Sequence, residues 1–83
     1  MITVGEVLTR TQLQLWQTAC DNVAKHCQDG YAINYAKAGR KMVRLDEVRT
    51  QALYILNNIK HWRSDLAREV RVNLKAVSTW DQP

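Results

Sequence analysis

The fold depends most on residues 30–45, GYAINYAKAGRKMVRL, which lie between two segments with helical apolar spacing. The first half of this stretch has a two-residue period in side chains that favour β-structure, which predicts a strand. Gly39 can adopt the positive φ of a tight turn, and alternation resumes over residues 41–45 through Val43. The stretch therefore predicts a β-hairpin, and its first strand is marked by Tyr31, Ile33 and Tyr35.

A helix is predicted over residues 1–29. Thr3 and Glu6 have the spacing of a capping box, and Thr9 or Thr11 offers a second possible start. Gly30 stands where a C-terminal cap is expected, so the helix should end there. Apolar residues recur between these ends at spacings of three and four, as on one buried helix face: Leu13, Trp16, Cys20, Val23, Ala24 and Cys27.

A second helix is predicted after the hairpin. Asp46 and Glu47 place an N-cap oxygen and negative charge at its start. No glycine or proline interrupts the chain before Arg68 or Val70, where this helix should end. Its predicted apolar face consists of Val48, Ala52, Ile55, Leu56, Ile59, Trp62 and Leu66.

The C-terminal residues 71–83 are predicted to form an extended arm, because Val70, Val72 and Leu74 alternate as in a strand. The expected fold class is therefore α+β, a small helix, β-hairpin, helix core with an extended C-terminal arm. The core domain would cover residues 1–70, with residues 1–10 as an N-terminal extension.

Composition points to one small globular domain, since the chain has 83 residues, of which 46% are hydrophobic and 24% charged. No apolar stretch approaches the roughly 20 residues of a membrane span, and the start lacks the basic and apolar pattern of a secretion signal. We expect neither membrane insertion nor secretion. Cys20 and Cys27 would lie about 10 Å apart along one helix, too far for a disulfide, so a reducing compartment is expected.

Several features together resemble the gpW-like head-completion, or head-tail joining, proteins of tailed phages. They are Gly39-Arg40 in the turn, the strand Lys41-Met42-Val43-Arg44, and Leu45-Asp46-Glu47-Val48 opening a helix that continues through Ile55, Ile59 and Trp62. The likeness covers residues 11–68. It implies a virion protein at the head-tail interface, present in the host cytoplasm during assembly. There it would form a homo-oligomeric, dodecameric ring under the portal protein after DNA packaging and dock neck or tail proteins.

Positive charge gathers in the predicted hairpin. Residues 30–45 contain four basic residues and no acidic one, whereas residues 1–29 contain two basic and three acidic residues. Such a cluster attracts phosphates without reading base sequence. The alternative is that these charges only keep the edge strands of the hairpin from aggregating. The predicted DNA-facing residues, in the lumen of the ring, are Lys37, Arg40, Lys41 and Arg44.

Partner contacts are predicted near the C-terminus. Trp80 on a polar arm would be a good interface anchor, so residues 70–82 are expected to lie along a neighbouring subunit or neck protein as an added strand. The alternative is that the arm folds back onto its own core. Basic and acidic residues are mixed between Lys60 and Lys75, which favours protein contacts over DNA. The interface candidates are Arg68, Arg71, Val72, Leu74, Val77 and Trp80.

No arrangement of residues indicates catalysis. His26 with Cys20 and Cys27 lacks the short paired spacings of a zinc site. His61 and Asp65 share a helix face, but nothing supplies a third ligand or a nucleophile. Trp16 and Trp62 on the helix faces, and Tyr31 and Tyr35 on one strand face, are expected in the core or a subunit interface rather than stacked on bases. We therefore expect no enzyme, no metal and no cofactor.

Two other functions remain open beside the ring adaptor. One is a small basic DNA-binding regulator that uses the hairpin or the second helix. Against it, about 16 residues of strand-like sequence separate the helices, in place of the short turn of a helix-turn-helix. The other is a small inhibitor or antitoxin-like binding protein.

Overall fold

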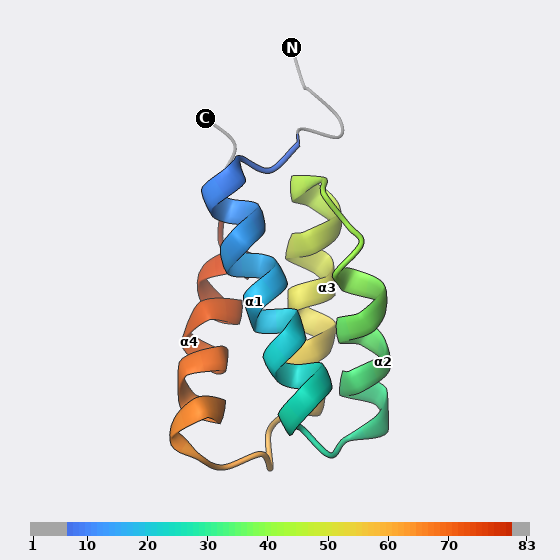
Figure 1. Cartoon of the computed structure of the whole chain (residues 1–83), viewed down its shortest axis with the longest axis vertical. Coiled ribbons are helices and arrows are strands. Elements are labelled where there is room, and N and C mark those ends of the chain that lie inside the picture. Colours follow the sequence, from blue (N-terminus) through green and yellow to red (C-terminus); the bar gives the residue numbers. More distant parts are fainter. Residues whose placement is uncertain (1–6, 81–83) are drawn as a thin grey trace.

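The protein is an all-helical bundle. The computed structural model describes residues 7–80, and within that range it has four α-helices and no sheet. Each helix packs against the next, and α4 packs back against α1, so the helices enclose one core. The α+β prediction is therefore wrong. The helices are α1 (Arg10–His26), α2 (Gly30–Gly39), α3 (Leu45–Asn58) and α4 (Asp65–Ser78) (Figure 1).

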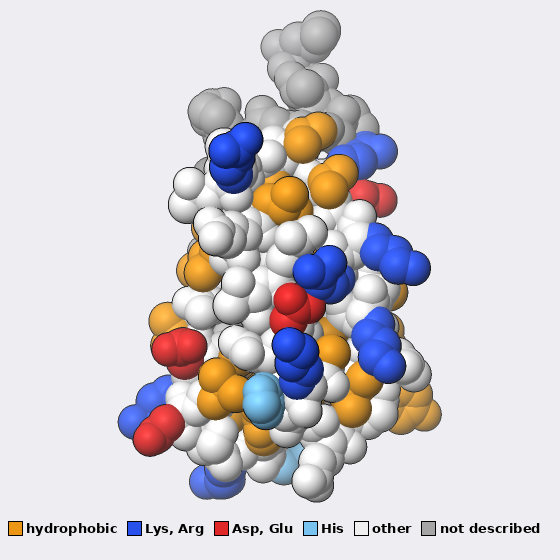
Figure 2. All heavy atoms as spheres, viewed as in Figure 1, with side chains coloured by type: hydrophobic (Ala, Val, Ile, Leu, Met, Phe, Trp, Pro, Cys, Tyr) orange, Lys and Arg blue, Asp and Glu red, His pale blue; other side chains and the backbone are white. Residues whose placement is uncertain are grey.

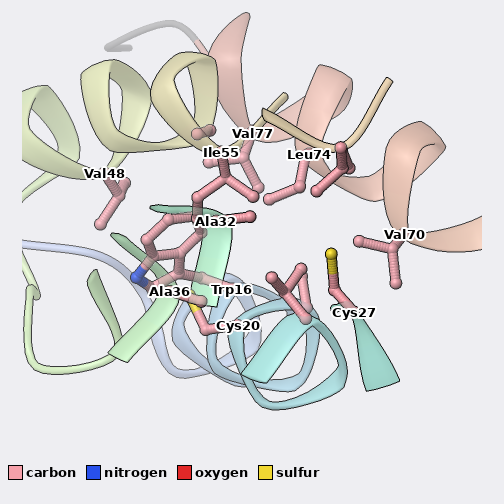
Figure 3. Packing of buried hydrophobic residues seen from close by; sticks show 14 of the residues in the cluster. Trp16, Cys20, Cys27, Ala32, Ala36, Val48, Ile55, Val70, Leu74 and Val77 are labelled. Atoms are coloured by element: carbon pink, nitrogen blue, oxygen red, sulfur yellow. The ribbon is translucent and has the colours of Figure 1, made fainter. Parts of the chain in front are cut away.

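The core contains the predicted apolar faces of the first and third helices. Trp16 and Ile55 are its largest fully buried side chains, and they point toward one another between the helices (Figure 3). Most of the predicted helical spacing is thus confirmed, because residues three and four apart do share a buried face. The residues that bear this out are Trp16, Cys20, Val23 and Cys27 in and just after α1, and Val48, Ala52, Ile55 and Ile59 in and just after α3.

The predicted hairpin is replaced by α2 and a loop. Within residues 7–80, the only strand-like pairing is an isolated bridge between Val7 and Arg44. The buried face of α2 is instead made of small residues spaced four and three apart, Ala32, Ala36 and Gly39. Alanine is the strongest helix former, and small side chains let α2 approach its neighbours closely. This burial outweighs the two-residue alternation of the larger side chains.

The C-terminal end of α2 is held from two sides. The indole Nε1 of Trp16 donates a buried hydrogen bond of 2.8 Å to the carbonyl oxygen of Gly39. From α3, the side-chain amide of Gln51 donates to the carbonyl of Tyr35 at 2.9 Å. A Cβ on Gly39 would lie 2.8 Å from Cζ2 of Trp16, so the close approach of α1 and α2 requires a glycine here.

Local capping explains where the first two helices begin. Thr9 and Gln12 form a reciprocal capping box at the start of α1, which confirms one of the two alternative starts. The predicted box of Thr3 and Glu6 lies outside the described residues. Asp29 caps α2, its carboxylate accepting from the Ala32 N–H at 2.9 Å. Gly30 is consequently the first residue of α2 and not a cap of α1.

The predicted long second helix is two helices. Asp46 and Glu47 do place negative charge in the first turn of α3, but the predicted N-cap oxygen is wrong, because the N-cap is Arg44 and no side chain caps this helix. The chain leaves the helix at Ile59. Ser64 then caps α4, its hydroxyl accepting from the backbone N–H of Ala67 at 2.9 Å. No glycine or proline marks this break. The polar residues that end α3 and cap α4 are the only local signals for it.

The predicted extended arm is wrong, because most of it belongs to α4. Helix α4 extends to Ser78 across the predicted domain boundary at residue 70. Every third or fourth residue is buried in the shared core, which is a helical period and not a strand period. The buried positions of α4 are Ala67, Val70, Leu74 and Val77.

No helix within residues 7–80 is long and apolar enough to span a bilayer.

Candidate functional site

The four predicted DNA-facing residues do come together, although no hairpin brings them there. Lys37 lies in the last turn of α2, and Arg40 is the C-cap of the same helix. Lys41 follows in the loop, and Arg44 is the N-cap of α3. We call these four residues the α2 basic surface. It is set at a fixed place in the bundle because the end of α2 is held by Trp16 and Gln51.

Two of the four cations have carboxylate partners. The Nε of Arg40 donates to Oδ1 of Asp21 at 2.6 Å, and both side chains are exposed, at 52% and 37%. This hydrogen bond and the charge of Asp21 raise the pKa of Arg40. The Nε of Arg44 is 3.7 Å from Oδ1 of Asp46, which is too long for a hydrogen bond. Both arginine side chains are partly exposed, but the Nε atom of Arg44 is itself buried and has no hydrogen-bond partner.

Lys37 and Lys41 are the free charges of this surface. Both are exposed, and within residues 7–80 no carboxylate lies within 4.0 Å of either ammonium group. They are four residues apart in the chain, Lys37 in the last turn of α2 and Lys41 in the loop that follows. In Figure 2 lysines and arginines lie along the α2 side of the molecule, with acidic side chains beside some of them.

Two tyrosines lie on α2 before the α2 basic surface, and a third lies on α3. Tyr31, in the first turn of α2, is 70% exposed. Tyr35 lies one turn later and contacts Tyr54 of α3, with ring centroids 5.5 Å apart and planes inclined at 37°. Tyr54 is itself 48% exposed. The prediction that Tyr31 and Tyr35 share one strand face is wrong, because this segment is helical. It also missed Tyr54, which only the packing of α2 on α3 brings to Tyr35.

The predicted interface candidates do not share one surface. Leu74 and Val77 are fully buried in the core of their own chain, and Trp80 is half-buried against that core. Arg71 is half-buried and donates to the carbonyl of Trp62 at 2.6 Å, closing the loop between α3 and α4. Within the described range, the candidates that face outward are Arg68 and Val72, one turn apart on α4.

A cavity of about 420 Å³ lies at the end of the bundle where the α1–α2 and α3–α4 connections meet. Sequence inspection considered His26 and His61 separately and did not bring them together. His26 lies three residues before Asp29, the cap of α2, and His61 lies three residues before Ser64, the cap of α4. This shared position in the two connections is the signal that could have indicated that both histidines line one cavity. The lining residues are His26, Cys27, Gln28, Asp29, Asn58, His61, Trp62 and Arg63. We call this space the loop-end cavity.

No metal site or reactive thiol is found among the described residues. No group of three or more His, Cys, Asp or Glu within residues 7–80 has the geometry to hold a metal ion. Burial, with a smaller contribution from Asp21, raises the pKa of Cys20 to about 12. This thiol is therefore neutral at physiological pH and is a core side chain, since the thiolate is the nucleophile.

Comparison with known proteins identifies no relative: no family model, curated protein or solved structure matches this chain. The segment in which the gpW-like resemblance placed a turn and a strand, residues 39–44, forms the end of α2 and the following loop. Of the features that carried the resemblance, the acidic opening of α3 is present in the structure.

Proposed function

We propose that this protein binds the phosphate backbone of nucleic acid through the α2 basic surface, without reading base sequence. The observation that carries the proposal is the pair Lys37 and Lys41, which are exposed and have no carboxylate within 4.0 Å among residues 7–80. Lysines that neutralise phosphates release condensed counterions, and this term dominates affinity for nucleic acid backbones.

Arg40 and Arg44 extend the same surface. Their carboxylate partners lie on the surface too, and an exposed ion pair contributes little to stability. A phosphate can therefore replace Asp21 beside Arg40 at small cost, and the guanidinium fork suits a phosphate well. The four cations face two carboxylates here, so the surface keeps a net positive charge.

The proposal covers what two of the sequence-based hypotheses share. A basic DNA-binding regulator needs such a surface, and a ring adaptor that surrounds packaged DNA would use it without base recognition. The adaptor's portal, neck and tail partners, its ring and its place in the virion stay predictions from the resemblance. The α2 basic surface, in contrast, follows from the positions of α2 and α3 and does not depend on the resemblance.

The test is fluorescence anisotropy with two labelled DNA duplexes of unrelated sequence at several salt concentrations. We expect similar affinity for both duplexes and weaker binding as salt rises. The double variant Lys37→Gln/Lys41→Gln should weaken binding to both duplexes and reduce the slope of log K against log salt by about 2, since each phosphate contact contributes about 0.9.

The matched control is Arg68→Gln/Lys75→Gln, which removes the same charge from exposed positions of α4. It should leave the salt slope nearly unchanged. Circular dichroism would establish that both double variants keep the helical fold. An equal loss of affinity in the two double variants would show a general effect of net charge, and the proposal would fail.

A further inference from the structure

The loop-end cavity has no role in the proposed function, because it lies beyond the N-terminal end of α2 whereas the α2 basic surface lies at its C-terminal end. We propose that this cavity is a separate binding site for a nucleoside monophosphate group. The group would be a free nucleotide or the 5′-phosphorylated terminal nucleotide of a strand. This proposal does not depend on backbone binding by the α2 basic surface.

The size and rigidity of the cavity suit a small ligand. Its volume of about 420 Å³ is within the range of small-molecule sites. The backbone of Trp62 is held on both sides, its N–H donating to the Ile59 carbonyl at 3.1 Å and its carbonyl accepting from Arg71 at 2.6 Å. On the facing connection, the N–H of Cys27 donates to the Val23 carbonyl at 3.0 Å. The backbone at these walls therefore loses little entropy when a ligand binds.

The walls combine an aromatic ring with amide side chains. Trp62 packs partly against the core and also lines the cavity, so its indole offers a fixed surface on which a planar base can stack. Asn58 donates its amide to the carbonyl of Tyr54 at 2.8 Å, which leaves its amide oxygen as an acceptor. Gln28 adds a second amide on the opposite wall. These groups match the donors and acceptors at the edge of a base.

Arg63 is the side chain of the cavity lining that can pair with a phosphate. Arg63 is exposed, and within residues 7–80 no carboxylate lies within 4.0 Å of its guanidinium. Asp29 is the one acidic side chain in the lining, and its Oδ1 is already engaged by the N–H of Ala32 as the cap of α2. The two lining histidines add ring N–H donors. In Figure 2 the histidines lie at the lower end of the molecule, where these connections meet.

The test is an NMR titration of the ¹⁵N-labelled full chain with AMP, adenosine and inorganic phosphate. AMP should shift the amides of both connections and the indole N–H of Trp62. Adenosine and inorganic phosphate should each bind at least about tenfold more weakly than AMP, because each makes only part of the contacts. If phosphate alone binds as well as AMP, or if no probe shifts these signals, the proposal is wrong.

Variants separate this site from the rest of the surface. Arg63→Gln should lower the affinity for AMP about tenfold, whereas the exposed Arg68→Gln should leave it unchanged. The variant Lys37→Gln/Lys41→Gln should also bind AMP normally. If it does not, AMP is bound at the α2 basic surface and the cavity site is rejected, while the proposed function would still stand.

A final comparison identifies the source of the nucleotide. Short single strands with and without a 5′-phosphate are titrated under the same conditions. If the strand with a 5′-phosphate shifts the cavity signals and the strand without it does not, capture of a strand end is supported. Shifts by AMP but by neither strand would support a free nucleotide and exclude the strand end.

Discussion

The substitution Gly39→Ala tests the packing that places the α2 basic surface. Gly39 ends α2 directly beneath Trp16, and its φ lies outside the left-handed region, so a side chain here is limited by space and not by backbone strain. An added Cβ would lie 2.8 Å from Cζ2 of Trp16 and 2.9 Å from Cγ of Gln51. Trp16 is fully buried, and Gln51 is held by its hydrogen bond to Tyr35, so neither can move freely.

The expected loss follows from two opposing effects. Overpacking of a buried contact costs about 1–3 kcal/mol. Alanine is better than glycine by up to about 1 kcal/mol inside a helix, and by less at the last residue. We therefore expect Gly39→Ala to lower the free energy of unfolding by about 1–2 kcal/mol, which lowers the Tm by about 4–16 °C for a domain of this size.

The assay is thermal and urea unfolding followed by circular dichroism. Gly30→Ala is the matched control, because an added Cβ there has no neighbour within 4 Å. It should change stability by no more than about 0.5 kcal/mol. In the background of Trp16→Phe, which removes the crowded part of the indole, Gly39→Ala should cost about 1 kcal/mol less.

Two results would refute the reasoning. One is that Gly39→Ala leaves the Tm unchanged, and the other is that Gly39→Ala raises the Tm while Gly30→Ala lowers it. Additive effects of Gly39→Ala and Trp16→Phe would also contradict it. In either case the Cα of Gly39 would not be crowded by the indole of Trp16.

Three further predictions concern the rest of the bundle. Arg71→Met removes the hydrogen bonds to the carbonyls of Ile59 and Trp62 and should lower the free energy of unfolding in urea by about 1–2 kcal/mol. The control Arg68→Met, at an exposed position, should lower it by less than about 0.5 kcal/mol. Equal losses in the two variants would contradict the role of Arg71. Because the pKa of Cys20 is raised from 9.0 to about 12 in the folded state, its contribution to stability is complete below pH 9 and is lost as the pH rises toward 12. In Cys20→Ala the decline in unfolding free energy across that window should be smaller, and an identical decline would refute the buried thiol. Ser64→Ala removes the acceptor for the Ala67 N–H and should cost about 1 kcal/mol, seen as a lower urea midpoint; an unchanged midpoint would show that this cap contributes nothing.

Much of α1 and α3 could be predicted from the sequence, because their signals are local. Trp16, Cys20 and Val23 recur at the helical period, and they are buried together in α1. Thr9 and Asp46 are found near the starts of α1 and α3, where their oxygens or charge suit a helix N-terminus. Such features depend only on residues a few positions apart.

The candidate sites were predictable only in part. The four cations of the α2 basic surface are close in the sequence, so any fold would keep them near one another. The pairing of Tyr35 with Tyr54 and the meeting of His26 with His61 join residues far apart in the chain. No local pattern predicts such pairs, because they arise from the packing of whole helices.

The sequence by itself determined the two strongest apolar helix faces, the cap at Thr9 and the concentration of positive charge after residue 36. Only the tertiary structure decided that residues 30–39 form a helix, that the chain turns at Ile59, and that residues 65–78 close the bundle. The physical reason lies in burial. Alternating tyrosine and isoleucine favour a strand locally, but a strand here would have no sheet to join. As a helix, the same segment buries Ala32, Ala36 and Gly39 against α1 and α3.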